Sequence, residues 1–440
     1  MLGNSNAHAP EIAWQIFFWG SLLVLFFTYF GYPVVLFFIA PFRKRPVIRS
    51  EPHEPTLTIL IPARNEARHI ESKIRNACEL DYPAHKMEIL IVDDASDDDT
   101  FARGIATIES IVRGEATLRQ ANPEIARRIR FIRLDESHGK ANALNRAARE
   151  ATGEILVFSD ADSLISVHSL RRLVQPFSNP IVGCVAGRYF AGGVHGRNAA
   201  GVGFYWRYEN YLRRKESQVG GLLGASGALY AVRRETFDDL PSGLINDDFV
   251  IPMLIGSKGY RTLYEPSATA MEDESRNAQI EFGRRVRIMA GNCQHLWLFR
   301  GLFLSPKRWR MAIQMFCHKL LRVLSPLWLL LAFASNVALI GHSFYSVLFL
   351  IQAILYGLAG VGAFLNGRLG KSRLLTLPYY FTMVNVAALG GMYYFLFDRK
   401  GLAWNARSQV SGNEPGDSES DSPGEVSSKS AHTAGNSRLS

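Results

Sequence analysis

Cysteine is scarce in this sequence. The chain of 440 residues contains four, at Cys78, Cys184, Cys293 and Cys317. No two of them have a spacing typical of a metal site or a redox pair, so the sequence indicates neither a disulfide framework nor a zinc site. This cysteine usage is typical of a domain that folds in a reducing, cytosolic environment.

Charge is missing from one long stretch near the N-terminus. Residues 14–40 carry no formal charge and are rich in Leu, Phe, Val and Trp. At about 1.5 Å per residue, a helix of this length crosses a hydrocarbon core of about 30 Å, so we predict a transmembrane helix. A cleaved signal peptide is the alternative, but the apolar run is too long, and it leads into Arg43-Lys44-Arg45 instead of a small-residue cleavage site.

Three further apolar runs, at 320–341, 344–365 and 374–397, predict three more transmembrane helices. The basic residues directly after the first span place residues 1–13 outside and the segment 51–280 in the cytosol. With four crossings, the C-terminus is expected to return to the outside.

The remaining segments differ in composition. Residues 281–310 mix arginines with apolar residues, which predicts amphipathic helices at the membrane surface. Residues 408–440 are rich in Ser, Gly, Pro and acidic residues without periodicity, which predicts disorder. The formal charge of +9 comes from basic residues beside apolar runs, so anionic lipids and an anionic substrate explain it better than nucleic acid does. We expect an integral protein of the inner membrane that binds no nucleic acid.

The segment 51–280 alternates short apolar runs with helical patterns. Runs at 57–61, 88–92, 130–133 and 155–158 have the length and composition of buried strands, and the stretches between them are long enough for crossover helices. This alternation predicts a parallel, Rossmann-like α/β sheet. Ligands of such sheets bind beyond the carboxyl ends of the strands. Three of these strands run into polar clusters, which we expect to converge at one edge.

Asp160 and Asp162 form one of these clusters. They follow an apolar strand with one small residue between them, so both carboxylates leave the strand end from neighbouring positions. Two carboxylates in this arrangement bind a hard divalent cation that also takes oxygens from a diphosphate, as Mg²⁺ prefers. Alone, the pair would more often be solvated turn residues, so the interpretation depends on its context.

Four motifs supply that context. They are Ile61-Pro62-Ala63-Arg64-Asn65-Glu66, Val92-Asp93-Asp94-Ala95-Ser96-Asp97-Asp98, His138-Gly139-Lys140-Ala141-Asn142-Ala143-Leu144-Asn145 and Ser159-Asp160-Ala161-Asp162. In order and spacing the set resembles the inverting family-2 glycosyltransferases, and is similar to the membrane-integrated branch that contains the cellulose, hyaluronan and poly-N-acetylglucosamine synthases. The resemblance implies a nucleotide-sugar-binding domain of the GT-A type with a mixed sheet, joined to one N-terminal and about three C-terminal transmembrane helices.

The resemblance also implies donor-binding residues. Asp93 and Asp94 match the acids that hold the nucleoside base and ribose, groups that suit carboxylate acceptors. Pro62, Arg64 and Glu66 match the floor of the same pocket. A further match, Lys140, stands near a helix start, where it is placed to balance phosphate charge. Asp160 and Asp162 match the residues that hold Mg²⁺ or Mn²⁺ with the donor.

Two segments match the acceptor side of the family. The small residues at 220–228 permit close approach of the backbone to a sugar, and the resemblance assigns Ala225, Ser226 and Gly227 to the acceptor. Asp248 matches the catalytic base, and its neighbour Asp247 is the reserve candidate. An inverting displacement needs one carboxylate to take the proton of the acceptor hydroxyl.

The sequence departs from the family at 281–292. Processive synthases usually have Gln-x-x-Arg-Trp there, whereas this chain has Arg284 and Ile288 at the Gln and Trp positions and keeps Arg287. Arg284 and Arg287 still suit a diphosphate. The loss of the aromatic position leaves processivity open, and the same residues also suit a helix at the membrane surface.

Two enzymatic functions and one non-enzymatic function fit this sequence. The first is metal-dependent transfer of a sugar from a nucleotide-sugar, expected to be UDP-linked, to a glycan or glycolipid at the cytosolic membrane face. The alternative is a polyprenyl-phosphate sugar synthase that adds one sugar to a lipid phosphate. A non-catalytic nucleotide-sugar sensor is the third, and the complete set of acidic motifs argues against it.

Overall fold

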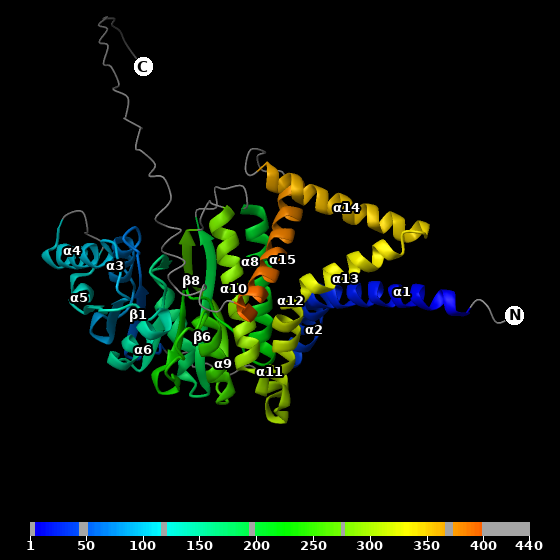
Figure 1. Cartoon of the computed structure of the whole chain (residues 1–440). Helices are drawn as coiled ribbons and strands as arrows, with labels where there is room; N and C mark the ends of the chain where they lie inside the picture. Colours follow the sequence, from blue (N-terminus) through cyan, green and yellow to red (C-terminus); the bar gives the residue numbers. More distant parts are fainter. Residues whose placement is uncertain are drawn as a thin grey trace, which may run out of the picture.

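The computed structural model describes residues 5–43, 52–115, 121–192, 199–273, 278–365 and 373–397. A mixed sheet with its helices lies at one end of the molecule, and long apolar helices project from the other (Figure 1). The described strands form one eight-stranded sheet in the order β3-β2-β1-β4-β7-β6-β8-β5. Their bounds are β1 Leu57–Ala63, β2 Met87–Asp93, β3 Ile129–Arg133, β4 Ile155–Phe158, β5 Ser163–Ile165, β6 Val182–Gly192, β7 Tyr230–Arg233 and β8 Arg261–Asp273.

Four strands form the parallel half that the sequence predicts. β1 pairs in parallel with both β2 and β4, and β2 pairs in parallel with β3. Ala63 stands opposite Asp93, and Leu60 stands opposite Phe158, so the carboxyl ends of β1, β2 and β4 meet at one edge. The other half is mixed: β7 is antiparallel to β4 and β6, whereas β6 is parallel to β8.

The sheet is covered on both faces because its central strands are apolar on both. In β1, Leu57, Ile59 and Ile61 pack into one core cluster with α3 and α4, whereas Leu60 packs into another with α6 and α9. This alternation follows from the two-residue period of a strand. Each such fully buried side chain contributes roughly 1.5–3 kcal/mol to the stability of the domain.

The helices of this domain connect the strands and lead toward the long apolar helices. Gly139, at φ 88°, directly precedes α6 and allows the turn that starts that helix at Lys140. The helix bounds are α3 Ile70–Cys78, α4 Thr100–Arg113, α5 Pro123–Ala126, α6 Lys140–Glu150, α7 Ser169–Val174, α8 Ala199–Val219, α9 Asp247–Ser257 and α10 Ala278–Leu298.

Three helical segments are long and apolar enough to cross a membrane, namely Pro10–Phe42, Ser343–Phe364 and Leu374–Phe397. A fourth candidate is a pair of helices bent by 54°, Pro306–Val323 and Ser325–Ala338. The described part of the chain therefore has one N-terminal and two or three C-terminal helices of this kind. They comprise α1 Ser5–Phe26, the π-helix η1 Phe27–Gly31, α2 Tyr32–Ile39, α11 Trp309–Gln314, the π-helix η9 Met315–Leu320, α12 Leu321–Val323, α13 Ser325–Ala338, α14 Ser343–Phe364 and α15 Arg373–Phe397.

The bent pair differs from the single span predicted over 320–341. α13 has 14 residues, about 21 Å of helix, which is less than a hydrocarbon core of about 30 Å. Pro326 has no backbone N–H, and its ring would clash with a carbonyl group of the preceding turn in a continuous helix, so the helix is interrupted before α13. The predicted tail at 408–440 and the first four residues lie outside the described residues.

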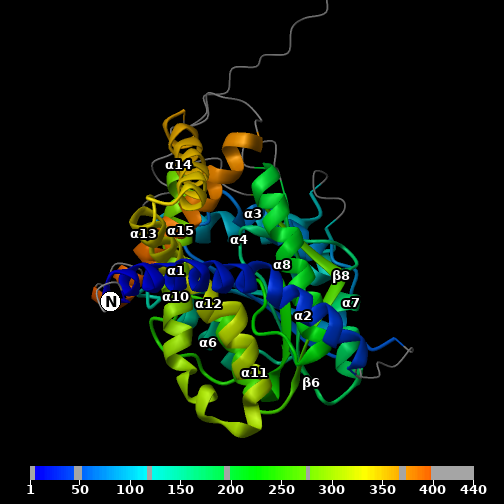
Figure 2. The same cartoon turned by 90° about the vertical axis from the view of Figure 1, so that its right-hand side faces the viewer.

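The domain that contains the sheet packs against the long apolar helices. α2 packs against α8 through Tyr32, Leu36 and Leu212 (Figure 2). α10 packs so closely on α15 that a Cβ at Gly391 would stand 2.7 Å from the Cβ of Met289. The segment predicted to lie at the membrane surface, 281–310, therefore begins as a helix packed against a candidate span.

Candidate functional site

The carboxylates at the end of β2 are buried and accept hydrogen bonds from hydroxyl and backbone N–H groups. Asp94 is 0% exposed, and it accepts hydrogen bonds from Ser137 Oγ (2.7 Å), His138 N (3.0 Å) and Gly139 N (2.9 Å). It therefore fixes the loop that leads into α6. Asp93 accepts hydrogen bonds from the backbone and hydroxyl of Ser96, and burial raises its pKa despite them.

The residues after β1 lie beside these acids. Arg64 places one guanidinium nitrogen 3.6 Å from Asp94 Oδ2 and is almost fully buried. Glu66 is also buried, and its carboxylate contacts His69 Nδ1 at 2.8 Å. Pro62 lies inside β1 and not after it. The residues predicted to bound the nucleoside thus lie near the ends of β1 and β2, where Arg64 contacts Asp94.

Lys140 connects two of the predicted acidic motifs. Its Nζ lies 2.7 Å from Asp160 Oδ1 and 2.9 Å from Asp247 Oδ1. Burial alone would lower the pKa of Lys140, but the carboxylates of Asp160, Asp247 and Asp248 raise it above its usual value. The ammonium group is therefore fixed in its charged form, at the first residue of α6.

A buried lysine that sequence reasoning missed lies beneath Asp160 and Asp162. Lys73 is 0% exposed, and its Nζ donates to Ser159 Oγ (2.6 Å) and to the carbonyl oxygen of Ser163 (2.7 Å). Burial lowers its pKa to about 7, although both carboxylates oppose this shift. The signal was present in the sequence, because Lys73 stands on the apolar stripe of α3 with Ile70, Ile74, Ala77 and Cys78.

The small-residue loop at 220–228 lies between the predicted metal-binding pair and the predicted base. Gly227 N donates to Asp248 Oδ2 (3.1 Å), while Gly227 O accepts from Asp160 N (3.0 Å). A Cβ at Gly227 would stand 2.4 Å from Asp160 Oδ2. Ala225 N also donates to the backbone oxygen of Asp248 at 2.7 Å. The absence of a side chain at Gly227 thus allows the two carboxylates to approach the same backbone segment.

The two candidate bases in the first turn of α9 have different surroundings. Asp247 is 4% exposed, and its oxygens contact Lys140 and the hydroxyl of Tyr230 (3.1 Å). Asp248 is only partly buried and lines the large cavity described below. Burial and the charge of Asp247 raise the pKa of Asp248 to about 6. Of the two, Asp248 is better placed to exchange a proton with a ligand.

The arginines of α10 face the same region. Arg284 pairs with Glu272 of β8 at 3.1 Å, and this carboxylate raises the pKa of the guanidinium. Arg285 pairs with Glu281 at 2.6 Å, and Arg287 lines the cavity. Diphosphate binding and a position at the membrane are compatible roles for α10. The helix packs on α15 with one side and presents arginines to the cavity with another.

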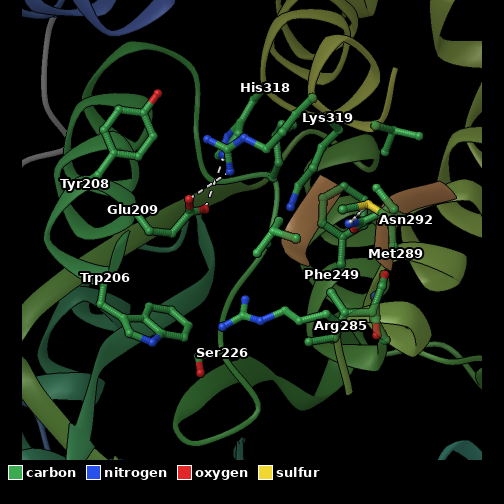
Figure 3. Close-up of a pocket in the computed structure, with 18 of the residues that line it drawn as sticks. Trp206, Tyr208, Glu209, Ser226, Phe249, Arg285, Met289, Asn292, His318 and Lys319 are labelled. Atoms are coloured by element: carbon green, nitrogen blue, oxygen red, sulfur yellow. Dashed lines mark hydrogen bonds and ion pairs between the residues drawn. The ribbon is translucent and has the colours of Figure 1, made fainter. Parts of the chain in front are cut away.

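A cavity of about 1010 Å³ extends from these residues to the membrane helices. Figure 3 shows Lys319 and Arg285 extending into it, with Trp206 and Phe249 on its walls. Pro62, Arg64, Glu66, Asp93, Asp94 and Asp162 are not on its wall. The predicted site residues that line it are Lys140, Asp160, Ala225, Ser226, Gly227, Asp247, Asp248, Arg284 and Arg287.

An ionic network that no sequence pattern predicts lies on the cavity wall. His318 Nδ1 lies 2.7 Å from Glu216 Oε1, and its Nε2 lies 3.3 Å from Glu209 Oε1. Arg322 pairs with Glu209 at 3.0 Å, and Tyr32 donates to Glu216 at 2.6 Å. These residues come from α8, η9, α12 and α2, so the network joins the domain that contains the sheet to the candidate membrane spans.

The described residues contain no group of three or more His, Cys, Asp or Glu side chains that could alone hold a metal ion. Asp160 and Asp162 nevertheless fit a hard divalent cation. They offer carboxylate oxygens from adjacent positions of one loop, and Mg²⁺ is commonly held by one or two carboxylates with substrate phosphates and waters completing the shell.

Comparisons with known proteins agree with this geometry. The model of "Glycosyl transferase family 2" matches residues 58–240, and that of "Glycosyl transferase family group 2" matches 155–364. A mannosyltransferase from Pyrobaculum calidifontis, solved in complex with GDP-Man and Mn²⁺, shares the fold. Its TM-score is 0.66 at 24% identity, over 86% of this chain and 99% of that one.

Curated relatives are similar over part of their length. Poly-beta-1,6-N-acetyl-D-glucosamine synthase from Staphylococcus aureus is 26% identical over 298 residues, which is 65% of this chain and 65% of that protein. Beta-monoglucosyldiacylglycerol synthase from Synechocystis sp. is 25% identical over 62% of this chain and 55% of that protein. Because the two overlapping family matches run from residue 58 to residue 364 across the whole site, the chain belongs to the family-2 glycosyltransferases and is related to the branch of the poly-N-acetylglucosamine synthases.

Proposed function

We propose that this protein transfers a sugar, with inversion, from a nucleotide-sugar to an acceptor hydroxyl at the cytosolic face of the inner membrane. The observation that carries the proposal is the position of Asp248. Its carboxylate lies on the cavity wall, is oriented by Gly227 N–H and has a raised pKa, while Lys140 and Asp160 stand beside it. The proposed base, a cation and a carboxylate of the proposed metal site thus lie within one cluster.

In the proposed reaction Asp248 takes the proton of the acceptor hydroxyl. The acceptor oxygen then forms a bond to C1 of the sugar, while the bond between C1 and the phosphate oxygen breaks and the nucleoside diphosphate leaves. General-base catalysis of this kind contributes about 10²–10⁴-fold to a rate. Lys140 holds its positive charge beside the leaving group, where charge develops.

The donor is proposed to lie across the edge formed by β1, β2 and β4. Asp93, Asp94 and the residues Pro62, Arg64 and Glu66 would bound the nucleoside side. Arg284 and Arg287 would approach the diphosphate from α10. Mg²⁺ or Mn²⁺ held by Asp160 and Asp162 would neutralise diphosphate charge as the leaving group departs. UDP-linked sugars are the first donors to test, and Ala225, Ser226 and Gly227 would contact the acceptor.

The test uses the full-length protein in lipid bilayers. It is incubated with a panel of radiolabelled nucleotide-sugars in the presence of Mg²⁺ or Mn²⁺, and products are separated by solvent extraction and by size. We expect metal-dependent transfer from one donor into an extractable lipid or a larger glycan, with the anomeric configuration inverted. Transfer that persists unchanged in chelator would exclude the metal assignment, and retention of configuration would exclude single displacement by an acceptor activated by Asp248.

A further inference from the structure

The cavity beside Asp248 continues well past the space that a sugar needs. Beyond the catalytic residues it is lined from one side by Leu22, Phe26 and Phe30 of α1 and η1. Leu377 and Phe381 of α15 line it from the other side. All of these helices belong to segments long and apolar enough to cross a membrane. An apolar space of this kind between candidate spans suits hydrocarbon chains and not a hydrated glycan.

Arg213 of α8 marks the polar end of this space. The residue is 9% exposed and lines the cavity, and its Nη2 donates to the carbonyl oxygen of Ala225 at 3.0 Å. Its Nη1 is buried and has no hydrogen-bond partner among the described residues. A buried guanidinium nitrogen without an acceptor is costly, so this group is poised for an anionic ligand. Its charge also reaches Asp248, whose pKa it lowers against the effect of burial.

Lys319 of η9 supplies a second cation. Its Nζ lies 4.8 Å from the ring centroid of Phe249, and no carboxylate within the described ranges forms an ion pair with it. Glu209 and Glu216 stand on the same wall, but they are paired with His318 and Arg322. Arg213 is hydrogen-bonded to Ala225, whose N–H donates to Asp248, and Lys319 lies over Phe249, the next residue, so the two cations lie in one region.

We propose that the acceptor is a membrane lipid whose head group carries both a phosphate and the reacting hydroxyl. The phosphate lies between Arg213 and Lys319, the hydroxyl reaches Asp248, and the hydrocarbon chains extend between α1–η1 and α15. A guanidinium fork and an ammonium group together are well suited to phosphate oxygens. This inference rests on the proposed function for the hydroxyl transfer, whereas the binding of the lipid phosphate is independent of it.

The inference fixes how the proposed transfer is balanced. The hydroxyl of the lipid head group gives its proton to Asp248, and its oxygen forms the new bond to C1 of the sugar. The nucleoside diphosphate leaves with the electron pair of the broken bond. The bonds of the lipid phosphate do not change during the transfer, and the phosphate only anchors the lipid by its charge. The product is therefore a glycosylated phospholipid with its phosphate intact.

The test measures lipid binding without any transfer. Full-length protein in detergent is titrated with short-chain phosphatidylglycerol, with diacylglycerol of the same chains and with glycerol 3-phosphate, and bound ligand is counted by native mass spectrometry. We expect one phosphatidylglycerol to bind at least tenfold more tightly than either probe, because diacylglycerol lacks the phosphate and glycerol 3-phosphate lacks the chains. Arg213→Gln and Lys319→Gln should each weaken phosphatidylglycerol binding about tenfold, which is about 1.4 kcal/mol, and leave diacylglycerol binding unchanged.

Arg214→Gln is the matched control. Arg214 is the next residue of α8 and is exposed, so its loss removes one positive charge near the membrane without touching the cavity. Equal affinity for the two lipids would overturn the proposal, because it would mean that the phosphate contributes nothing to binding. The same loss in the control as in Arg213→Gln would also overturn it, in favour of attraction to general positive charge. If Arg213→Gln does not fold, the affinities of Arg213→Lys and Lys319→Gln for phosphatidylglycerol are measured in its place. A failed donor panel with selective phosphatidylglycerol binding would refute the proposed transfer but not this lipid site.

Discussion

The two acidic regions of the site hold their carboxylates in different ways. At the end of β2, Asp94 is bound by two backbone N–H groups and a hydroxyl, and Asp93 by Ser96. Around β4 and α9, Asp160 and Asp247 instead share the single ammonium group of Lys140. The first region is held mainly by backbone N–H groups and short hydroxyl side chains, and the second by the end of one long lysine side chain.

This difference separates a scaffold from a reacting centre. Several fixed hydrogen bonds to one carboxylate hold the loop before α6 in place, whatever the ligand does. Each oxygen of an ionised carboxylate has two lone pairs, so a carboxylate paired with one lysine can still accept from a ligand. We therefore expect substitutions in the first region to lower stability and donor affinity, and substitutions in the second to lower the transfer rate at saturating donor.

The largest effect on the rate is expected from Asp248→Asn. The amide keeps the size of the side chain but cannot take a proton, so transfer should fall about 10²–10⁴-fold while nucleotide binding and thermal unfolding stay close to wild type. Initial rates at saturating donor and acceptor measure this loss. Asp239→Asn is the control, because Asp239 is an exposed carboxylate that pairs with Arg149 away from the cavity. Near-normal transfer by Asp248→Asn would shift the role of base to another group.

The next effect concerns the loop between the two carboxylates. In Gly227→Ala the new methyl would stand 2.4 Å from Asp160 Oδ2, so the carboxylate or the loop must move. Displacements of about 1 Å near a reacting centre cost on the order of 10²-fold in rate, and we expect a loss of this size. Gly301→Ala is the matched control, because a Cβ there meets nothing within 4 Å. A Gly227→Ala variant with full activity would show that this loop position does not constrain the site.

A stability effect is expected in the first region. Asp94→Asn removes the charge from a carboxylate that accepts three hydrogen bonds, which should lower the free energy of unfolding by about 1.5–3 kcal/mol. Thermal unfolding of the variant measures the loss. Asp97→Asn, at a side chain 81% exposed in the same loop, should change stability by less than about 0.5 kcal/mol. Equal stability of the two variants would contradict the scaffold role of Asp94.

Much of the parallel half of the fold was predictable from sequence. The strands at 57–61, 88–92 and 155–158 are short apolar runs that end in polar clusters, and the structure places those clusters at one edge. Each of these strands can be recognised locally, because its apolar run and the polar residues after it are neighbours in the sequence. The mixed half was inferred only from the family resemblance, because pairing of β7 with β4 and β6 depends on contacts between distant segments.

The cavity was not predictable for a related reason. Arg213 and Lys319 lie 106 positions apart in the sequence, on helices whose patterns indicate only a basic surface. Their shared region appears when α8 and η9 pack together, and no local motif encodes that packing. Lys73 is the exception, since a lysine on the apolar stripe of α3 could have been recognised as buried. The bend before α13 could likewise have been predicted, if Pro326 had been recognised as the start of a new helix within an apolar run.

The smallest expected effect is a shift of the pH profile. The pKa of Asp248 is raised to about 6 by burial and by the neighbouring charge of Asp247. A base must be deprotonated to act, so kcat/KM should rise as the pH increases through about 6 and level off above it. One pH unit below this pKa, the rate should be about one tenth of its plateau, as follows from titration of a single group.

Asp247→Asn sharpens this test, because it shows whether the charge of Asp247 contributes to the raised pKa of Asp248. It removes the second contribution to the raised pKa of Asp248 while keeping an oxygen that can accept from Tyr230. The acidic limb of the profile should therefore move to lower pH, even if the plateau rate falls because Lys140 loses a partner. Nucleotide binding measured at the same pH values separates donor affinity from proton transfer. An acidic limb that stays in place would mean that burial alone raises the pKa, whereas a limb that moves upward would contradict the assignment of Asp248 as the group that titrates.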